Sequence, residues 1–268
     1  MRLVGRLAVG VFKESVRDRV LYGLVIFAAV LMAATYLLGQ LTAGQDIKII
    51  KDLGLASIST LGLFMAVFVG IGLVWREVER RSIYNLLSKP VTREQFILGK
   101  YAGLVLTLAV NVAAMTAAFY LVLAYMNWNA DDIMRRSWPA PALDPALMIA
   151  IGLIGVELLV VTAVALFFST FSSPFLSAVL TLALWVVGHF NDDLKHFDAV
   201  VDSRPAVWVA RALYYLLPDL SAFDVKSQVV HGLPVPAAAV ALAVGYGAVY
   251  IAFLLVAAML IFQRKDLQ

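Results

Sequence analysis

The sequence predicts an all-α integral membrane protein with six transmembrane helices. Of its 268 residues, 62% are hydrophobic and 15% are charged, whereas an average globular chain is roughly 45–50% apolar and 25% charged. The mean hydropathy is +0.89. The apolar residues also gather in six long runs. Together these observations exclude a soluble globular domain, a disordered chain and a fibrous repeat.

Residues 1–19 are predicted to form an amphipathic helix in the inner headgroup layer. At 100° per residue, the cations Arg2, Arg6, Lys13 and Arg17 fall within a stripe about 60° wide. Such a stripe can face anionic lipid while the apolar residues lie on the other faces of the helix. The alternative is a positively charged anchor without an ordered helix.

Six segments come close to the roughly 20 mostly apolar residues that a spanning helix needs. The fifth is the shortest, and all six belong to one domain over residues 1–268. The predicted spans are residues 20–38, 53–75, 101–126, 145–168, 174–190 and 236–262.

Local sequence signals mark several helix starts. Asp144 and Ser173 each place a capping oxygen directly before a proline. Thr92 and Gln95 form a capping box, so a helix should begin near Arg93 and continue into the third span. Residues 205–218 are apolar but too short to cross, and they contain Arg211. We expect a helix over residues 206–217 that re-enters the outer leaflet before the last span.

The distribution of lysine and arginine sets the orientation. Residues 1–19, 76–100, 169–173 and 263–268 hold 13 of these cations in 55 residues, whereas the remaining loops, residues 39–52, 127–144 and 191–235, hold 8 in 77. Positive charge concentrates on the cytoplasmic side. Both termini are therefore predicted to be cytoplasmic, in a multi-pass protein of the inner, cytoplasmic membrane.

The cytoplasmic stretch at residues 77–87 combines charges with an apolar cluster. Glu77 and Arg81 are spaced to pair on a helix, and Pro90 ends that helix. A short helix of this kind suits docking into a groove of another protein, and the alternative is a solvated loop. The residues assigned to this contact are Glu77, Glu79, Arg80, Arg81, Ile83, Tyr84 and Leu87.

Few polar side chains lie inside the predicted spans. Glu157 sits midway along the fourth span, and an intramembrane carboxylate is a functional candidate by default. A structural role with hydrogen bonds to neighbouring helices is the alternative, as it is for Asn111. The candidate pathway residues are Ser57, Ser59, Thr60, Thr181 and Glu157.

We predict no metal site. His189, Asp192, Asp193 and His196 share one helical face and could bind a divalent transition metal. An acidic, capped helix end in water explains the same spacing, however. The chain also contains no cysteine, which excludes disulfides, thiolate metal sites and a catalytic cysteine.

Four stretches in a fixed order resemble the permease subunits of ABC-2-type transporters, and loosely the branch of multicopper-enzyme maturation permeases. The resemblance covers nearly the whole chain. Its motifs are the run Leu86-Leu87-Ser88-Lys89-Pro90-Val91 followed by Arg93 and Leu98-Gly99-Lys100, the turn at residues 169–174, the outer stretches 217–219 and 223–226, and the basic end at residues 262–267.

The resemblance implies one half of a transmembrane exporter. Two such subunits, this chain with a second copy of itself or a related permease, would assemble in the lipid bilayer with two ABC ATPase subunits. Residues 1–19 would be the connecting helix and residues 77–87 the coupling helix. The chain itself would need no cofactor, because ATP and Mg would bind the partner ATPase. No nucleic-acid partner is expected.

The sequence supports this assignment over two other classes of function. It lacks a glycine-rich loop ending in Gly-Lys-Ser or Gly-Lys-Thr, so ATP hydrolysis must belong to a partner chain. An intramembrane enzyme would need a nucleophile–base pair or a metal motif, whereas this chain has three histidines, no cysteine and no His-Glu-x-x-His. A non-transporting scaffold or maturation factor with the same fold remains an alternative.

Overall fold

The computed structural model describes residues 2–16, 26, 46–79, 92–138, 140–191, 195 and 204–264. Every element in that part of the chain is helical, which confirms the predicted all-α class. The elements are α1 (Arg2–Val16), α3 (Asp46–Glu79), α5 (Arg93–Asn129), α6 (Asp132–Ser137), α7 (Ala146–Ser169), α8 (Pro174–His189), α10 (Arg204–Leu216), the 3-10 helix η2 (Ser221–Phe223), α11 (Lys226–Val230) and α12 (Ala237–Arg264).

Four of the described helices are long and apolar enough to cross a bilayer. They are α3, α5, α7 and α12, and they coincide with the predicted spans at residues 53–75, 101–126, 145–168 and 236–262. Helix α3, with 34 residues, is longer than its predicted span, whereas α5, with 37 residues, begins at Arg93 as expected and ends at Asn129, just beyond its predicted span. At 1.5 Å per residue each exceeds about 50 Å, well beyond the ~30 Å hydrocarbon core. The predicted first span, residues 20–38, lies outside the described residues except for Ile26.

The predicted helix starts are confirmed by their hydrogen bonds. Thr92 and Gln95 make both bonds of the capping box at the start of α5. Ser173 caps α8 by accepting a hydrogen bond from the backbone of Leu176, with Pro174 at the first helical position. The Asp144 carboxylate accepts from the backbone N–H of Ala146 at 2.8 Å, which satisfies an orphan donor of α7.

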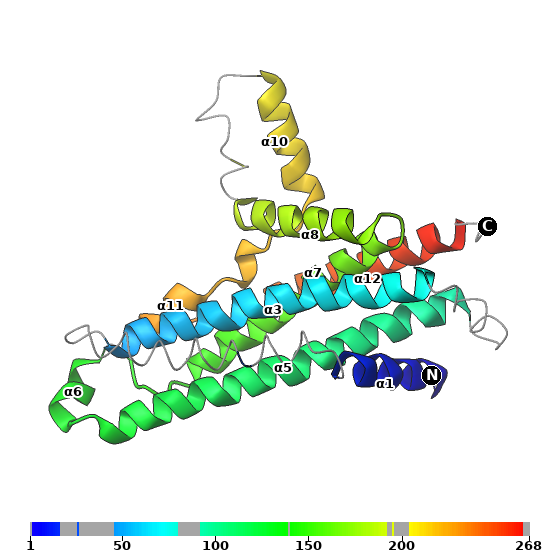
Figure 1. Cartoon of the computed structure of the whole chain (residues 1–268). Helices are drawn as coiled ribbons and strands as arrows, with labels where there is room; N and C mark the ends of the chain where they lie inside the picture. Colours follow the sequence, from blue (N-terminus) through cyan, green and yellow to red (C-terminus); the bar gives the residue numbers. More distant parts are fainter. Residues whose placement is uncertain are drawn as a thin grey trace.

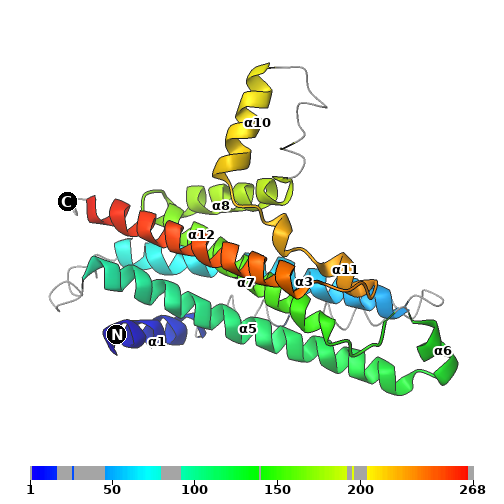
Figure 2. The same ribbon diagram turned by 180° about the vertical axis from the view of Figure 1, so that it is seen from behind.

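The four long helices run alongside one another as a bundle (Figures 1 and 2). The two chain ends lie at one end of this bundle, together with α1, while α6 and α11 lie at the opposite end. This arrangement agrees with the charge distribution, which predicts both termini on the same side. We call the end with the termini the inner end and the end with α6 and α11 the outer end.

Glycines set the closest helix contacts. A Cβ on Gly54 of α3 would lie 2.2 Å from the ring of Phe119 of α5, and one on Gly62 would lie 2.3 Å from Leu158 of α7. Close backbone approach of this kind is how small residues join membrane helices. On α7, in contrast, a Cβ on Gly152 or Gly155 would meet nothing within 4 Å. Gly152 and Gly155 therefore make no close helix contact within the single chain.

The amino-terminal helix packs lengthwise along α5. A Cβ on Gly99 would lie 2.7 Å from Leu7, and one on Gly103 would lie 2.5 Å from Val11 and 2.8 Å from the carbonyl oxygen of Ala8. In these contacts the residue numbers of α1 and α5 increase in the same direction, so the two helices run parallel. The predicted helix over residues 1–19 is thus confirmed for Arg2–Val16. Its buried side is formed against a helix rather than against lipid alone.

Helix α8 ends halfway along its neighbour α7. It has 16 residues, which corresponds to about 24 Å, and its last turn contacts Glu157, the twelfth of the 24 residues of α7. After α10, the chain passes the end of α8, where the backbone N–H of Leu220 donates to the carbonyl oxygen of Gly188. Helix α10 itself projects sideways from the bundle (Figures 1 and 2). A helix is present in the predicted region, at Arg204–Leu216, and its entry into the outer leaflet stays a prediction.

Candidate functional site

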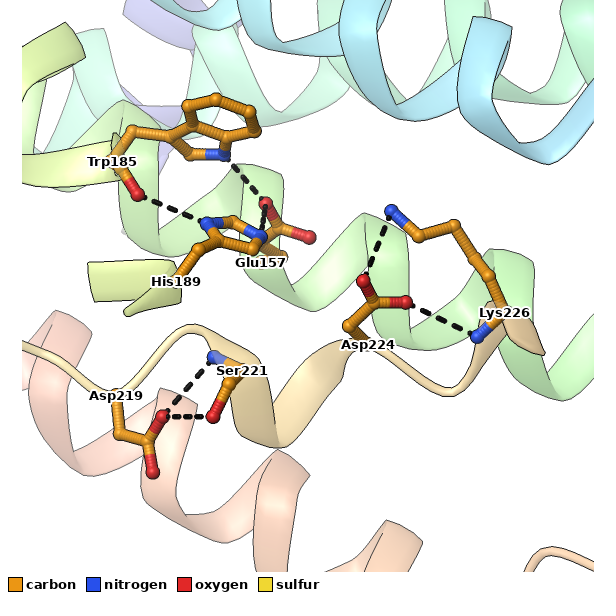
Figure 3. Close-up of polar contacts among 7 residues, drawn as sticks. All are labelled: Glu157, Trp185, His189, Asp219, Ser221, Asp224 and Lys226. Carbon is orange, nitrogen blue, oxygen red and sulfur yellow. Dashed lines mark hydrogen bonds and ion pairs between the residues drawn. The ribbon is translucent and has the colours of Figure 1, made fainter. Parts of the chain in front are cut away.

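A buried polar cluster joins α7 to the end of α8 at the middle of the bundle (Figure 3). The Glu157 side chain is completely inaccessible to solvent. Its Oε1 accepts a hydrogen bond of 2.7 Å from the indole Nε1 of Trp185. Its Oε2 has no hydrogen-bond partner among the described residues. A buried carboxylate with one unpaired oxygen is costly, so this site is a candidate for function rather than for stability alone.

His189 completes the cluster at the last residue of α8. Its Nε2 lies 3.5 Å from Glu157 Oε1, and its Nδ1 lies 2.9 Å from the carbonyl oxygen of Trp185 in the preceding turn. The two rings are also in contact, with centroids 4.6 Å apart. The spacing of four residues between Trp185 and His189 places both on the side of α8 that faces α7. Glu157 is thus held by two side chains from one helical turn.

The outer segment at residues 217–225 closes over the end of α8. The backbone N–H of Leu220 donates to the carbonyl oxygen of Gly188 at 3.0 Å, and a Cβ on Gly188 would collide with Pro218. Asp219 Oδ1 accepts hydrogen bonds from the backbone and hydroxyl of Ser221. The segment is therefore an ordered cover whose turn is fixed by its own polar side chains. It corresponds to the outer stretches singled out in the sequence.

This cover is tied to α12 as well as to α8. The backbone N–H of Asp219 donates to the hydroxyl of Tyr246 at 2.8 Å, and Phe223 is buried beside the Tyr246 ring. Asp224 and Lys226 form an ion pair of 3.5 Å at its end (Figure 3). The Glu157 cluster is thus bounded by α7, α8 and the cover.

The predicted pathway hydroxyls do not gather around Glu157 in one cluster. Ser57 donates to the backbone of Leu53 at 2.6 Å, and Thr181 donates to the backbone of Ser177 at 2.7 Å, so each is satisfied by its own helix. Ser59 is buried, whereas Thr60 is exposed. Thr60 belongs to an exposed stripe on α3, spaced at four residues, that also contains Ala56, Phe64 and Phe68. Asn111 donates to Thr107 of its own helix rather than to a neighbour.

Sequence reasoning missed a buried lysine near the outer end. Lys51 was expected in an outer loop over residues 39–52, but it lies on α3, which begins at Asp46. Its side chain is 1% exposed, and its Nζ donates to the carbonyl oxygen of Pro141 at 2.7 Å. Asp144 supplies a nearby negative charge. A lysine next to an apolar run was the available signal, but its partner 90 residues away is visible only in the fold.

Only the beginning of the predicted coupling segment is described. Glu77 and Glu79 belong to the last turn of α3, which carries the helix out of its apolar stretch at the inner end. Arg80, Arg81, Ile83, Tyr84 and Leu87 lie outside the described residues. Among the described residues, the inner end holds the start of α5 and the end of α12. Glu94 accepts a hydrogen bond from Gln263, and the rings of Phe96 and Phe262 stack with centroids 5.8 Å apart.

Of the four residues considered for a metal, the structure describes one. His189 faces Glu157, as given above, and Asp192, Asp193 and His196 lie outside the described residues.

An open apolar groove of about 700 Å³ lies between α5 and α7 on another side of the bundle, and Gly152 and Gly155 form part of its lining. It contains a hydroxyl from Thr116 and one from Tyr120.

Comparison with known proteins gives one positive finding. The family model described as ABC-2 family transporter protein matches residues 11–267, nearly the whole chain. A search of curated proteins finds no match.

Proposed function

Because this chain belongs to the ABC-2 family of transporter proteins, we propose that two copies, or one copy with a close relative, form an export pathway driven by separate ATPase subunits. Membership in the family makes the chain a permease component of an ABC transporter, a multi-pass membrane protein of transport rather than a catalyst. The number of copies, the export direction and the site of ATPase contact are parts of the proposal.

The observation that supports ATPase contact at the inner end is the reach of α3. Its apolar run ends at Trp75, but the helix continues to Glu79, about one turn farther. This turn carries the charged beginning of the segment at residues 77–87 beyond the apolar run. An ATPase that docks there would act directly on a helix that packs against both α5 and α7.

The test is retention of the ATPase and its turnover in proteoliposomes. Tyr84→Ala should weaken contact, because a truncated aromatic anchor typically costs at least about 2 kcal/mol of interface energy, and charge reversal of Glu79 with Arg80 should also detach or uncouple the ATPase. The matched controls lie at the outer end. They are Tyr125→Ala and charge reversal of the Asp132–Arg135 pair, whose side chains are 3.6 Å apart.

Wild-type ATPase retention and wild-type transport-linked turnover in both inner-end variants would show that residues 77–87 are a solvated loop. Retention of the ATPase with ATP turnover but with no substrate transport in the wild-type complex would instead favour the scaffold alternative.

The exposed stripe on α3 supports a pathway between two copies. Phe64 is 37% and Phe68 is 52% exposed, and Thr60 lies one turn before them on the same face. A second copy facing this stripe would place the Thr60 hydroxyls of both copies near the shared axis. In this cysteine-free chain, Phe64→Cys should give a disulfide-linked dimer in membranes. Leu121→Cys, exposed on α5, is the matched control, and equal cross-linking by both variants would exclude an interface at α3.

A further inference from the structure

Hydrogen-bond geometry fixes the proton on one nitrogen of His189. Its Nδ1 lies 2.9 Å from the carbonyl oxygen of Trp185. A carbonyl oxygen only accepts hydrogen bonds, so Nδ1 must carry a proton and donate it. In a neutral imidazole, Nε2 then has a lone pair and no proton. This is the nitrogen that faces Glu157 Oε1 at 3.5 Å.

One additional proton is therefore needed between Glu157 and His189. Without it, the Nε2 lone pair would face a carboxylate oxygen, and the negative charge of Glu157 would be buried without a cation. With it, either an imidazolium faces a carboxylate or a carboxylic acid faces a neutral ring. The pair has zero net charge in both arrangements. A second added proton would leave a buried cation, which is also costly.

The groups around the pair do not supply a compensating charge. Besides His189, the charged side chains that act electrostatically on Glu157 are Lys226 and Asp224, which form an ion pair with each other. Asp219 accepts hydrogen bonds from Ser221. The other titratable groups with described side chains on helices packed against α7 lie at the bundle ends or make their own contacts with the backbone, a neighbouring ring or another side chain. They are Lys48, Lys51, Asp52, Glu94, Lys100, Tyr101, Tyr120, Tyr125, His231, Tyr246 and Tyr250.

We propose that Glu157 and His189 form an intramembrane proton-binding site that holds one proton and thereby fastens the end of α8 to the middle of α7. This inference goes beyond the proposed transport function, because it requires neither an ATPase nor a substrate. The consequence reaches the outer cover, since Leu220 bonds to Gly188 in the turn that carries His189. Gain or loss of the proton would weaken the contact of both α8 and the cover with α7.

The test measures thermal unfolding of the full chain in detergent across a range of pH. The wild type should lose stability at acidic pH, where the pair becomes a cation, and at alkaline pH, where it becomes an anion. In Glu157→Gln the amide oxygen can still accept the hydrogen bond from Trp185, and no anion can form. This variant should no longer lose stability at alkaline pH but should still lose it at acidic pH.

His189→Gln should show the opposite behaviour. It cannot form the buried cation, so the acidic fall should disappear, while the remaining Glu157 still becomes an anion at alkaline pH. The double variant should lack both changes that depend on this pair. The exposed residues Glu94 and His231 offer matched controls, and Glu94→Gln and His231→Gln should retain both falls.

The proposal is overturned if both single variants still lose stability at acidic and at alkaline pH. It is also overturned if the two variants are both protected at the same pH extreme. A measurement on the wild type covers the case in which a variant does not fold. Nitrogen-15 NMR of the three histidines, with His231→Gln and His196→Gln for assignment by elimination, should show a proton on Nδ1 of His189 wherever the chain is folded. A neutral His189 ring with its proton on Nε2 would contradict the proposal.

Discussion

At the scale of single residues, Lys51 shows how a charged side chain can fasten a loop to the bundle. Its ammonium group is buried and donates a hydrogen bond to the carbonyl oxygen of Pro141, next to the buried Ala142. A hydrogen bond from a charged donor contributes about 1.5–3 kcal/mol. The contact joins the start of α3 to the segment that leads into α7, and it is the only described side-chain hydrogen bond between them.

Lys51→Met should keep the length and much of the packing of the side chain but free the loop. A loss of about 1.5–3 kcal/mol corresponds to roughly a tenfold to hundredfold rise in the opened population. In an Ala142→Cys background, maleimide labelling of the buried cysteine should accelerate accordingly. Lys48→Met, one turn earlier on α3, is the matched control. Equal labelling rates in the two backgrounds would show that the Lys51 contact does not hold the loop.

Residues differ in how far their roles could be predicted. A lone carboxylate in a long apolar run is conspicuous, so Glu157 was identified as a candidate from the sequence. Its partners were not identified as such, because Trp185 is an ordinary residue of an apolar helix and His189 was considered only for a metal. The contact of Glu157 with Trp185 spans 28 residues. It depends on the angle and depth at which α8 meets α7, which no local pattern contains.

At the scale of helices, starts were predicted better than ends and contacts. A cap is a local signal: Thr92, Gln95 and Ser173 act on the backbone within three residues of themselves. The lengths of α3 and α5 depend on what lies beyond the membrane layer, so hydropathy alone placed their boundaries too close together. Glycine contacts depend on the facing helix, which is why Gly103 is closely packed and Gly152 is open.

The contact of α1 with α5 provides a test at this scale. Gly103→Val should displace α1, because the new side chain would meet both Val11 and the backbone of Ala8, and backbone cannot yield as a flexible side chain does. In a Val11→Cys background, maleimide labelling of this buried position should be slow in the parent chain and faster after Gly103→Val. Gly10→Ala, which meets nothing within 4 Å, is the control. An unchanged labelling rate after Gly103→Val would place α1 elsewhere.

At the scale of the whole molecule, the path between α7 and α12 decides the topology. Helix α7 runs from the outer end to the inner end, and α12 does the same (Figures 1 and 2). The chain must therefore return to the outer end between Ser169 and Ala237. Helix α8 covers the inner half of this return, up to the level of Glu157. The cover and α11 complete it, because α11 contacts α3 and α7 at the outer end.

This return thus consists of α8 and, after α10, of the cover with its short 3-10 helix η2 and of α11, rather than one continuous helix. Irregular backbone at membrane depth is tolerated where protein covers it, and here α8, α7 and α12 surround the cover. The backbone hydrogen bonds of Leu220, Phe223 and Asp224 satisfy groups that lipid would leave unpaired. From hydropathy alone, residues 174–190 were predicted to cross the membrane. In the structure α8 ends level with Glu157, and the rest of the distance to the outer end is covered by residues 217–230, which hydropathy assigned to an outer loop.

Cysteine labelling in intact cells tests this path, because the chain contains no native cysteine. Ser227 is exposed on α11, and Phe171 is 46% exposed in the turn between α7 and α8. Ser227→Cys should react with a membrane-impermeant maleimide applied from outside, as should Ile133→Cys on α6, which is 86% exposed. Phe171→Cys should react only after the membrane is opened. If Ser227→Cys is protected in intact cells while Ile133→Cys reacts, α11 does not reach the outer surface, and the return between α7 and α12 must follow another route.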